Sequence, residues 1–134
     1  MNDFLAYHNP EKMGERAIDL EVHAVLTKKE VPRIIGDRVW LVTGEGSPRK
    51  YYLCDWFIVD RIETIDDPYF RKRISGRAGN FIRPMRRLDE HEWFPDFKRS
   101  NGNFGLGFQP INEVRFIKAL EKIAGGLSRG RVYN

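Results

Sequence analysis

Cysteine is almost absent from this sequence, and that scarcity excludes several kinds of protein. Cys54 is the single cysteine among 134 residues, so no internal disulfide framework is available. It lies in an apolar segment, where we expect a buried thiol rather than a reactive one. The histidines His8, His23 and His91 are far apart and lack metal-ligand spacing. We therefore expect no metal and no cofactor.

Long apolar runs are also missing. No stretch approaches the roughly 20 apolar residues of a membrane-spanning helix, and the opening residues MNDFLAYHNPEK show no signal-peptide pattern. A content of 41% hydrophobic and 13% aromatic residues is nevertheless sufficient for a packed core. We expect one domain over residues 1–134, located in the reducing cytoplasm and without a membrane partner.

Acidic residues are absent between residues 68 and 88, although the whole chain carries a net charge of only +4. This segment has seven basic residues, which leaves the rest of the chain at −3. Arginine suits polyanions, because its guanidinium group pairs with phosphate oxygens and stacks on bases. We predict phosphate contacts from Arg71, Lys72, Arg73, Arg77, Arg83, Arg86 and Arg87. The alternative is a solvated loop whose arginines form ion pairs.

Motifs for nucleophilic catalysis and for phosphate loops are missing as well. There is no GxSxG, and the glycine-rich GEGSPRK segment joins two strands instead of opening a helix. Glu45, Asp66 and Asp67 are better explained as solvated turn acids than as general bases. We assign no catalytic residue, and Arg49 and Lys50 stay candidate phosphate contacts.

What the sequence does have is a strong β pattern over residues 36–63. Two runs rich in β-branched and aromatic residues, 39–43 and 51–62, flank a loop that contains Gly44, Gly46 and Pro48. The second run is apolar on both faces, which predicts a strand covered on both sides. We predict a mainly β protein with peripheral helices, of the α+β class, built on a small antiparallel β-barrel.

Weaker patterns place the other elements. Strands are predicted at residues 3–10, 17–27 and 69–74, a flexible loop at 76–80 and a helical turn within 88–97. Residues 100–107 read as a tight loop from which Phe104 and Leu106 project. A C-terminal helix over residues 112–124 follows, with Asn112 as its N-cap, and residues 128–134 form a frayed tail.

Four segments together resemble the PUA-like superfamily: AYHNP, VPRIIGDRVWLV, YLCDWFIVDRIE and NFGLGFQPINE before a helix. Within it they are similar to EVE-type and YTH-related domains and to specificity domains of modification-dependent restriction systems. The resemblance implies a five- or six-stranded β-barrel with peripheral helices. It also implies binding of RNA or DNA, in several members with a modified base flipped into an aromatic pocket. Relatives of the ASCH type are ribonucleases.

The resemblance places a pocket after the first strand, walled by the central hairpin and the late loop. The matching positions are Tyr7, His8, Asn9, Trp40, Trp56, Asn103 and Phe104. Trp56 is the leading wall, with a plain core role as the equal alternative. The arginine-rich insert before Leu88 departs from the family, and no nuclease domain is attached, so a separate nuclease or effector chain is a candidate partner.

Three functions remain open from the sequence. The first is a module that binds DNA or RNA at a modified base without covalent change, which we favour. The second is a small ASCH-like ribonuclease that uses Arg or Lys with Tyr on the scissile phosphate. The third is a regulatory domain that holds a small ligand. Pocket aromatics without a titratable pair favour the first, and a Lys–Tyr–Arg cluster with a glutamate in reach favours the second.

Overall fold

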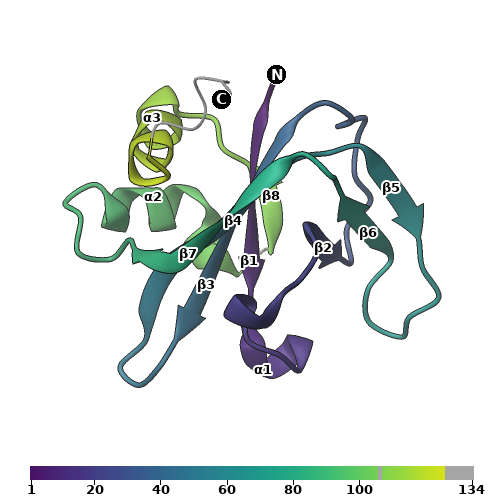
Figure 1. Ribbon diagram of the computed structural model, residues 1–134, viewed down its shortest axis with the longest axis horizontal. Coiled ribbons are helices and arrows are strands. Elements are labelled where there is room, and N and C mark those ends of the chain that lie inside the picture. The colour runs from purple at the N-terminus through teal and green to yellow at the C-terminus, as the bar shows by residue number, and fades with distance from the viewer. Residues whose placement is uncertain (106, 126–134) are drawn as a thin grey trace.

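The computed structural model describes residues 1–105 and 107–125, and within them the protein is mainly β with two sheets and three α-helices (Figure 1). The strands are β1 (Asp3–His8), β2 (Ala24–Thr27), β3 (Arg38–Glu45), β4 (Lys50–Ile58), β5 (Arg61–Thr64), β6 (Lys72–Ser75), β7 (Gly79–Arg87) and β8 (Phe108–Pro110). The helices are α1 (Pro10–Met13), α2 (Phe94–Ser100) and α3 (Val114–Ile123), with 3-10 turns η1 (Ala17–Asp19) and η2 (Gly102–Phe104). Leu106 and the tail predicted at 128–134 lie outside the described residues.

The larger sheet has the strand order β7-β4-β3-β1-β8, and the smaller sheet has the order β2-β6-β5. Strand β1 runs parallel to β3, with Tyr7 opposite Val42. The other pairings within the described ranges are antiparallel. The parallel pair departs from the predicted antiparallel arrangement. It is accommodated because residues 9–37 form a long crossover between the two strands, as parallel neighbours require.

Both faces of the larger sheet are covered, as the two-sided apolar pattern predicted. On one face Trp40 belongs to a core cluster that also contains Phe97 of α2 and Leu120 of α3. On the other face Phe57 belongs to a second cluster, together with Ile74 of the smaller sheet. Figure 1 shows α2 and α3 on one side of β3 and β4 and the smaller sheet on the other. The covering layers are therefore helices on one face and a sheet on the other.

The central hairpin is present, but its second run is divided between the two sheets. Strands β3 and β4 pair with Trp40 opposite Trp56, and a bulge follows Leu41. Strand β4 ends at Ile58, and β5 begins at Arg61 in the smaller sheet. Val59 donates its amide to the Asp37 carbonyl, whereas the next amide, that of Asp60, donates to Ser75 in the smaller sheet. The single strand predicted over residues 51–62 is wrong for this reason.

Other predicted bounds also need correction. The alternation over residues 17–27 predicts one strand, but the segment forms η1 and then β2. The second half of the loop predicted at residues 76–80 begins β7, because Gly79 lets this strand lie against β4. A Cβ at Gly79 would lie 2.4 Å from the Trp56 carbonyl oxygen. The helical turn expected within residues 88–97 is α2, which runs from Phe94 to Ser100.

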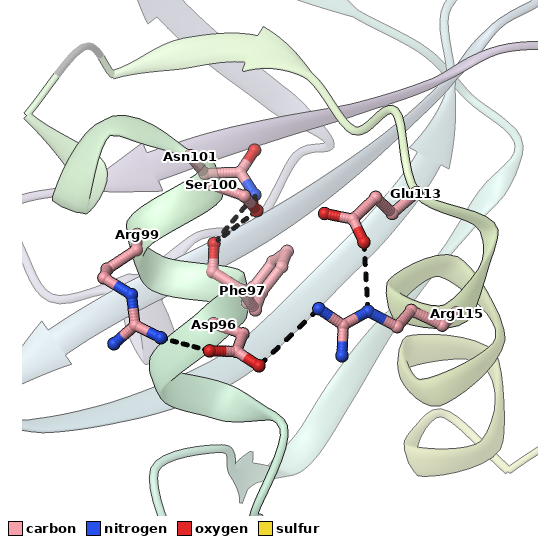
Figure 2. A network of polar contacts seen from close by, with 7 residues as sticks. All are labelled: Asp96, Phe97, Arg99, Ser100, Asn101, Glu113 and Arg115. Carbon is pink, nitrogen blue, oxygen red and sulfur yellow. Dashed lines mark hydrogen bonds and ion pairs between the residues drawn. The ribbon is translucent and has the colours of Figure 1, made fainter.

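The C-terminal helix is confirmed, although its predicted cap is not. Helix α3 begins at Val114, and Glu113, not Asn112, occupies the N-cap position. The Glu113 side chain makes no capping bond to the backbone and instead accepts from Arg115 Nε at 3.0 Å (Figure 2). Arg115 also lies 3.6 Å from Asp96 of α2, so an ion pair links α2 to the first turn of α3.

Arg38 connects three elements through a buried polar cluster. Its Nε donates to Asp3 of β1 at 2.6 Å and its Nη2 donates to Glu121 of α3 at 2.7 Å. The Trp40 indole also donates to Asp3, at 2.9 Å. Arg38 is 4% exposed and Asp3 is 6% exposed, so burial removes most of the water around both charges. The ion pair between them replaces part of that lost hydration.

Cys54 is buried, as predicted from its apolar neighbours. Its thiol donates to the Leu41 carbonyl oxygen at 3.3 Å, and burial raises its pKa well above the ordinary value. The thiolate needed for reactivity is therefore disfavoured.

Candidate functional site

A pocket of about 280 Å³ opens where the end of β1 meets α1, the end of β2 and the η2 turn. Aromatic side chains form much of its wall, and three basic side chains surround it. It is lined by Tyr7, Asn9, Lys12, Met13, Leu26, Thr27, Lys28, Arg49, Tyr51, Tyr69, Phe70, Asn103, Phe104, Gly105 and Gly107. Its volume is near the lower end of the range for small-molecule sites, about 300–1,000 Å³.

Three rings form a continuous aromatic wall. Tyr7 and Phe104 stack with ring centroids 5.3 Å apart and planes 16° apart. Tyr51 meets Phe104 edge-on at 5.5 Å. Phe104 is itself 5% exposed, and it also contacts Phe94 and Phe97 of α2 at 5.9 and 5.8 Å. The wall is therefore a continuation of the hydrophobic core, which holds it rigidly.

The backbone that presents Phe104 is unusual. Asn103 and Phe104 have φ values of 54° and 64°, a left-handed conformation that non-glycine residues rarely adopt. Such a conformation persists only where the surroundings determine it, and it is found preferentially at functional sites. Asn101 supplies part of that support, because its backbone carbonyl accepts the amide of Phe104 at 2.9 Å. Its side-chain amide in turn donates to the Phe97 carbonyl at 2.9 Å and to Ser100 Oγ at 3.2 Å, which ties it to the end of α2 (Figure 2).

Tyr69 stands at the pocket with a lysine on each side. Lys12 Nζ lies 3.3 Å and Lys28 Nζ 3.4 Å from its hydroxyl oxygen. The hydrogen bond from Lys12, and then that from Lys28, lowers the pKa of the Tyr69 phenol. The Asp67 carboxylate accepts the amides of Tyr69 and Phe70 at 2.8 and 2.9 Å, which fixes the turn that presents this tyrosine.

Arg49 lies at a second edge of the pocket and reaches Tyr7. Its Nη1 donates to the Tyr7 hydroxyl at 3.2 Å, and its Nη2 lies 3.5 Å from Glu11. Burial raises the pKa of Tyr7, and the Arg49 hydrogen bond opposes that shift. Gly44 makes this approach possible, because a Cβ there would lie 2.1 Å from the Tyr7 hydroxyl oxygen and 2.8 Å from Arg49 Cδ.

Of the predicted base-pocket residues, four line this one pocket: Tyr7, Asn9, Asn103 and Phe104. Asn9 also caps α1, since its Oδ1 accepts the amides of Glu11 and Lys12. Trp40 and Trp56 are not part of the pocket lining. Trp40 is fully buried, and Trp56 packs 6.3 Å from it against the same core cluster.

Sequence reasoning did not assign Lys12, Lys28, Tyr51 or Tyr69 to the pocket. These residues come from separate segments that meet only in the folded chain. The Asp67-Pro68 turn before Tyr69 is the one local signal that an aromatic side chain is held in place there.

The predicted phosphate-contact residues fall into two groups. Arg71, Lys72, Arg73 and Arg77 lie on or beside β6, and Arg83, Arg86 and Arg87 lie on β7. Several are held by acids: Arg73 by Glu63 at 3.1 Å, Arg77 by Asp60 at 3.2 Å and Arg87 by Asp89 at 2.9 Å. Arg83 donates to the Leu20 carbonyl. The predicted basic surface is therefore divided and partly neutralised.

Comparison of the chain with protein-family models, with curated proteins and with solved structures gives no match. In residues 1–105 and 107–125 no helix has the length and apolar character to cross a membrane. The same residues contain no group of three His, Cys, Asp or Glu side chains placed to hold a metal ion. His8 instead contacts the Glu15 carbonyl oxygen at 2.8 Å, and His91 stacks on Trp93.

Proposed function

We propose that this protein is a PUA-like, EVE-type module that binds DNA or RNA and accepts an extruded base in the pocket at Tyr7 and Phe104. The two sheets would correspond to the barrel of that superfamily. Lys12, Lys28 and Arg49 would contact the phosphates on either side of the extruded nucleotide. The proposal assigns no covalent change to the nucleic acid.

One observation carries the proposal. Asn103 and Phe104, both non-glycine, are left-handed in sequence at the wall of a pocket surrounded by three cations. Strain of this kind has to be offset elsewhere, and it serves to hold a side chain in a set position. Stacking on aromatic rings beside basic side chains is the general chemistry of single-stranded nucleic-acid binding.

The polar groups of the pocket define what a base edge would meet. Asn9 has its oxygen engaged by two backbone amides, which leaves its NH₂ group as a donor. Asn103 contributes an amide that both donates and accepts. A base fits this arrangement best if a hydrogen-bond acceptor on its edge faces Asn9. The group that faces Asn103 can be either a donor or an acceptor.

Binding to labelled oligonucleotides tests the proposal. The probes are single-stranded DNA, single-stranded RNA and duplexes that contain one methylated or one unpaired base. Tyr69→Ala should weaken binding by about 1–3 kcal/mol, the contribution of one stacking contact. Because Tyr69 is 44% exposed, its removal should leave the unfolding free energy almost unchanged.

A charge control accompanies that experiment. Lys12→Ala and Lys28→Ala should each weaken binding, whereas Lys118→Ala, the same change on the exposed face of α3, should not. Equal effects of all three lysine variants would mean that net charge alone drives binding. Full affinity of Tyr69→Ala and Tyr7→Ala for every probe would contradict base binding in this pocket.

A second candidate function is cleavage of RNA at the same site, and one observation favours it. The Tyr69 phenol has a lowered pKa between Lys12 and Lys28, and Arg49 lies beside both Tyr7 and Glu11. A Tyr69 phenolate would take the proton of a ribose 2′-hydroxyl, whose oxygen then attacks the adjacent phosphorus. The bond to the 5′ oxygen breaks, and Lys12 protonates that leaving oxygen.

Tyr69→Phe separates this function from binding, because it keeps the ring and removes the hydroxyl. Cleavage should be lost with binding retained, and a 2′-deoxy substitution at the scissile position should also abolish cleavage. Products should carry a 2′,3′-cyclic phosphate. If intact RNA is recovered from the wild-type protein under all conditions, the binding module stands alone.

A further inference from the structure

His23 and Asp55 form a buried pair outside the aromatic pocket. His23 Nδ1 lies 2.8 and 2.9 Å from the two Asp55 carboxylate oxygens. The Asp55 side chain is 1% exposed and the His23 side chain 13% exposed. The ring of His23 also stacks on Phe81, with centroids 4.2 Å apart. A carboxylate on Nδ1 fixes the imidazole and leaves Nε2 as the nitrogen that can meet a ligand.

The imidazole is not sealed in the core. It lines a hollow of about 450 Å³ whose other walls include Arg61, Arg73, Arg77 and Ser75. None of the lining residues of this hollow belongs to the aromatic pocket. The two features are therefore separate sites.

The charges around the hollow leave an excess of cations. Glu63 is shared by Arg61 and Arg73, each at 3.1 Å. Asp60 holds Arg77 at 3.2 Å. Three guanidinium groups of the lining thus meet two carboxylates, which leaves one positive charge in excess. Arg83, which is not part of the lining, adds a further positive charge nearby and lies over the ring of Phe81 at 4.4 Å. An anion placed here would offset this excess.

We propose that this hollow is a phosphate-binding site, in which His23 Nε2, Arg73 and Arg61 bind the oxygens of one phosphate group. Asp55 is the positioning residue, since it holds the imidazole through Nδ1. Arginine pairs with phosphate in a two-pronged geometry, and a charge-assisted bond from imidazolium adds a third donor. This assignment of the ligand rests on the nucleic-acid binding proposed above: the phosphate group belongs either to the end of a nucleic-acid strand or to its backbone, and the chemistry of the site is the same for both.

Protonation of the pair fits this role. Burial raises the pKa of Asp55 to about 8 and lowers that of His23, and the positive charge of Arg83 lowers both. The pair therefore keeps one proton between its two members in neutral solution. A bound phosphate draws that proton onto the imidazole, because the imidazolium can then donate from Nε2 to a phosphate oxygen while Nδ1 donates to Asp55.

The test follows the imidazole signals of His23 by NMR while inorganic phosphate is added to the wild-type protein. Sodium chloride at equal ionic strength is the reference. Phosphate, unlike chloride, should shift the His23 signals and raise the pH at which the ring loses its proton. Arg73→Gln should weaken the phosphate response about tenfold, the loss expected for one charge-assisted hydrogen bond. Arg99→Gln, the same change in an exposed pair on α2, should leave it unaltered.

Two further arms complete the design. A 5′-phosphorylated oligonucleotide that shifts His23 when its unphosphorylated form does not would identify a strand end as the source of the phosphate. Equal shifts from the two oligonucleotides would identify the nucleic-acid backbone as the source of the phosphate. Asp55→Asn keeps a partner for Nδ1 and should weaken the phosphate response, because the imidazolium form loses its counter-charge. The proposal is overturned if phosphate and chloride act alike on wild-type His23, or if Arg73→Gln binds phosphate as the wild type does.

Discussion

Tyr7 and Phe104 lie face to face, with 5.3 Å between their ring centroids and 16° between their planes. This spacing is within the usual range for an aromatic pair, about 4.5–7 Å, and it leaves no room for a third ring between them. A bound base would therefore lie against this pair and not inside it. The two rings act as one wall, with Tyr69 on another part of the pocket lining.

Gly44→Ala should disturb that wall without altering any of its side chains. The added carbon would lie 2.1 Å from the Tyr7 hydroxyl oxygen and 2.8 Å from Arg49 Cδ, so both side chains must move. We expect at least a tenfold loss of oligonucleotide affinity, about 1.4 kcal/mol, measured by fluorescence anisotropy. Arg49→Ala is the companion variant, because it removes the same contact with the Tyr7 hydroxyl without adding an atom. Wild-type affinity of Gly44→Ala would argue against a role for the Tyr7–Arg49 contact.

Trp56→Ala should act on stability and not on binding. Trp56 is partly buried and packs against Trp40, which belongs to the core between the larger sheet and the helices. Removal of a fully buried tryptophan side chain costs about 3–5 kcal/mol, and because Trp56 is only partly buried its loss should lie at or below the lower end of that range. Urea unfolding should show that loss, and the folded fraction should bind oligonucleotides as the wild type does. Normal stability with lost binding would restore Trp56 to the pocket wall.

The sequence predicts the elements that carry their own pattern. The central hairpin and the C-terminal helix each show a period that local residues alone define. The change of sheet between Val59 and Asp60 shows no such signal, because the apolar run continues while the hydrogen-bond partner changes. The parallel pairing of β1 with β3 is likewise a property of topology, which no short segment encodes.

Some residues of the pocket could be predicted from the sequence, and others could not. Tyr7, Asn9, Asn103 and Phe104 could be predicted, because a family resemblance covered the two segments that contain them. Lys12, Lys28 and Tyr69 come from segments whose meeting depends on the fold. Trp40 and Trp56 lie outside the pocket lining, and the core alternative for Trp56 could not be decided from the sequence, since a tryptophan in a strand has the same sequence pattern in a core as in a pocket.

Arg86 and Arg87 offer a test of the predicted basic surface, because they are neighbours on β7 with different surroundings. Arg87 is held by Asp89 at 2.9 Å, and the Arg87 hydrogen bond lowers the pKa of Asp89 to about 2. Arg86 has no ion pair among the described residues and is exposed. Each phosphate contact contributes about −0.9 to the slope of log affinity against log salt for duplex DNA, or about −0.7 for single strands. Arg86→Ala should flatten that slope by the amount of one phosphate contact, about 0.9 for duplex DNA or about 0.7 for single strands. Arg87→Ala should flatten it by less, because Asp89 already holds that arginine. A slope unchanged by Arg86→Ala would remove β7 from the binding surface.

Arg38→Ala should be among the most destabilising single changes. It leaves the buried Asp3 carboxylate without its cation and removes the link from β3 to Glu121 of α3. Breaking one side of a buried ion pair costs about 3–5 kcal/mol. Arg115→Ala breaks an exposed pair with Asp96 and should cost less than about 1 kcal/mol. Chemical unfolding of both variants measures the difference, and similar losses would mean that Arg38 is solvated.

The His23–Asp55 pair should make stability depend on pH in a narrow window. In the unfolded chain Asp55 is ionised above its ordinary pKa of 3.8 and His23 is neutral above 6.5. In the folded chain burial raises the pKa of Asp55 to about 8, so the pair still holds a proton between pH 6.5 and about 8. Folding therefore takes up one proton in this window, and the unfolding free energy must fall as the pH rises.

The size of the effect follows from the width of that window, which corresponds to about 2 kcal/mol at 1.36 kcal/mol per pKa unit. Just below pH 6.5 the raised pKa of Asp55 and the lowered pKa of His23 act in opposite directions, so the fall in stability should stop there. Urea unfolding at a series of pH values measures this profile. Asp55→Asn keeps a polar partner for Nδ1 but removes the titrating carboxyl group, so its unfolding free energy should no longer fall above pH 6.5. A wild-type profile as flat as that of Asp55→Asn would show that the pair holds no shared proton in the folded chain.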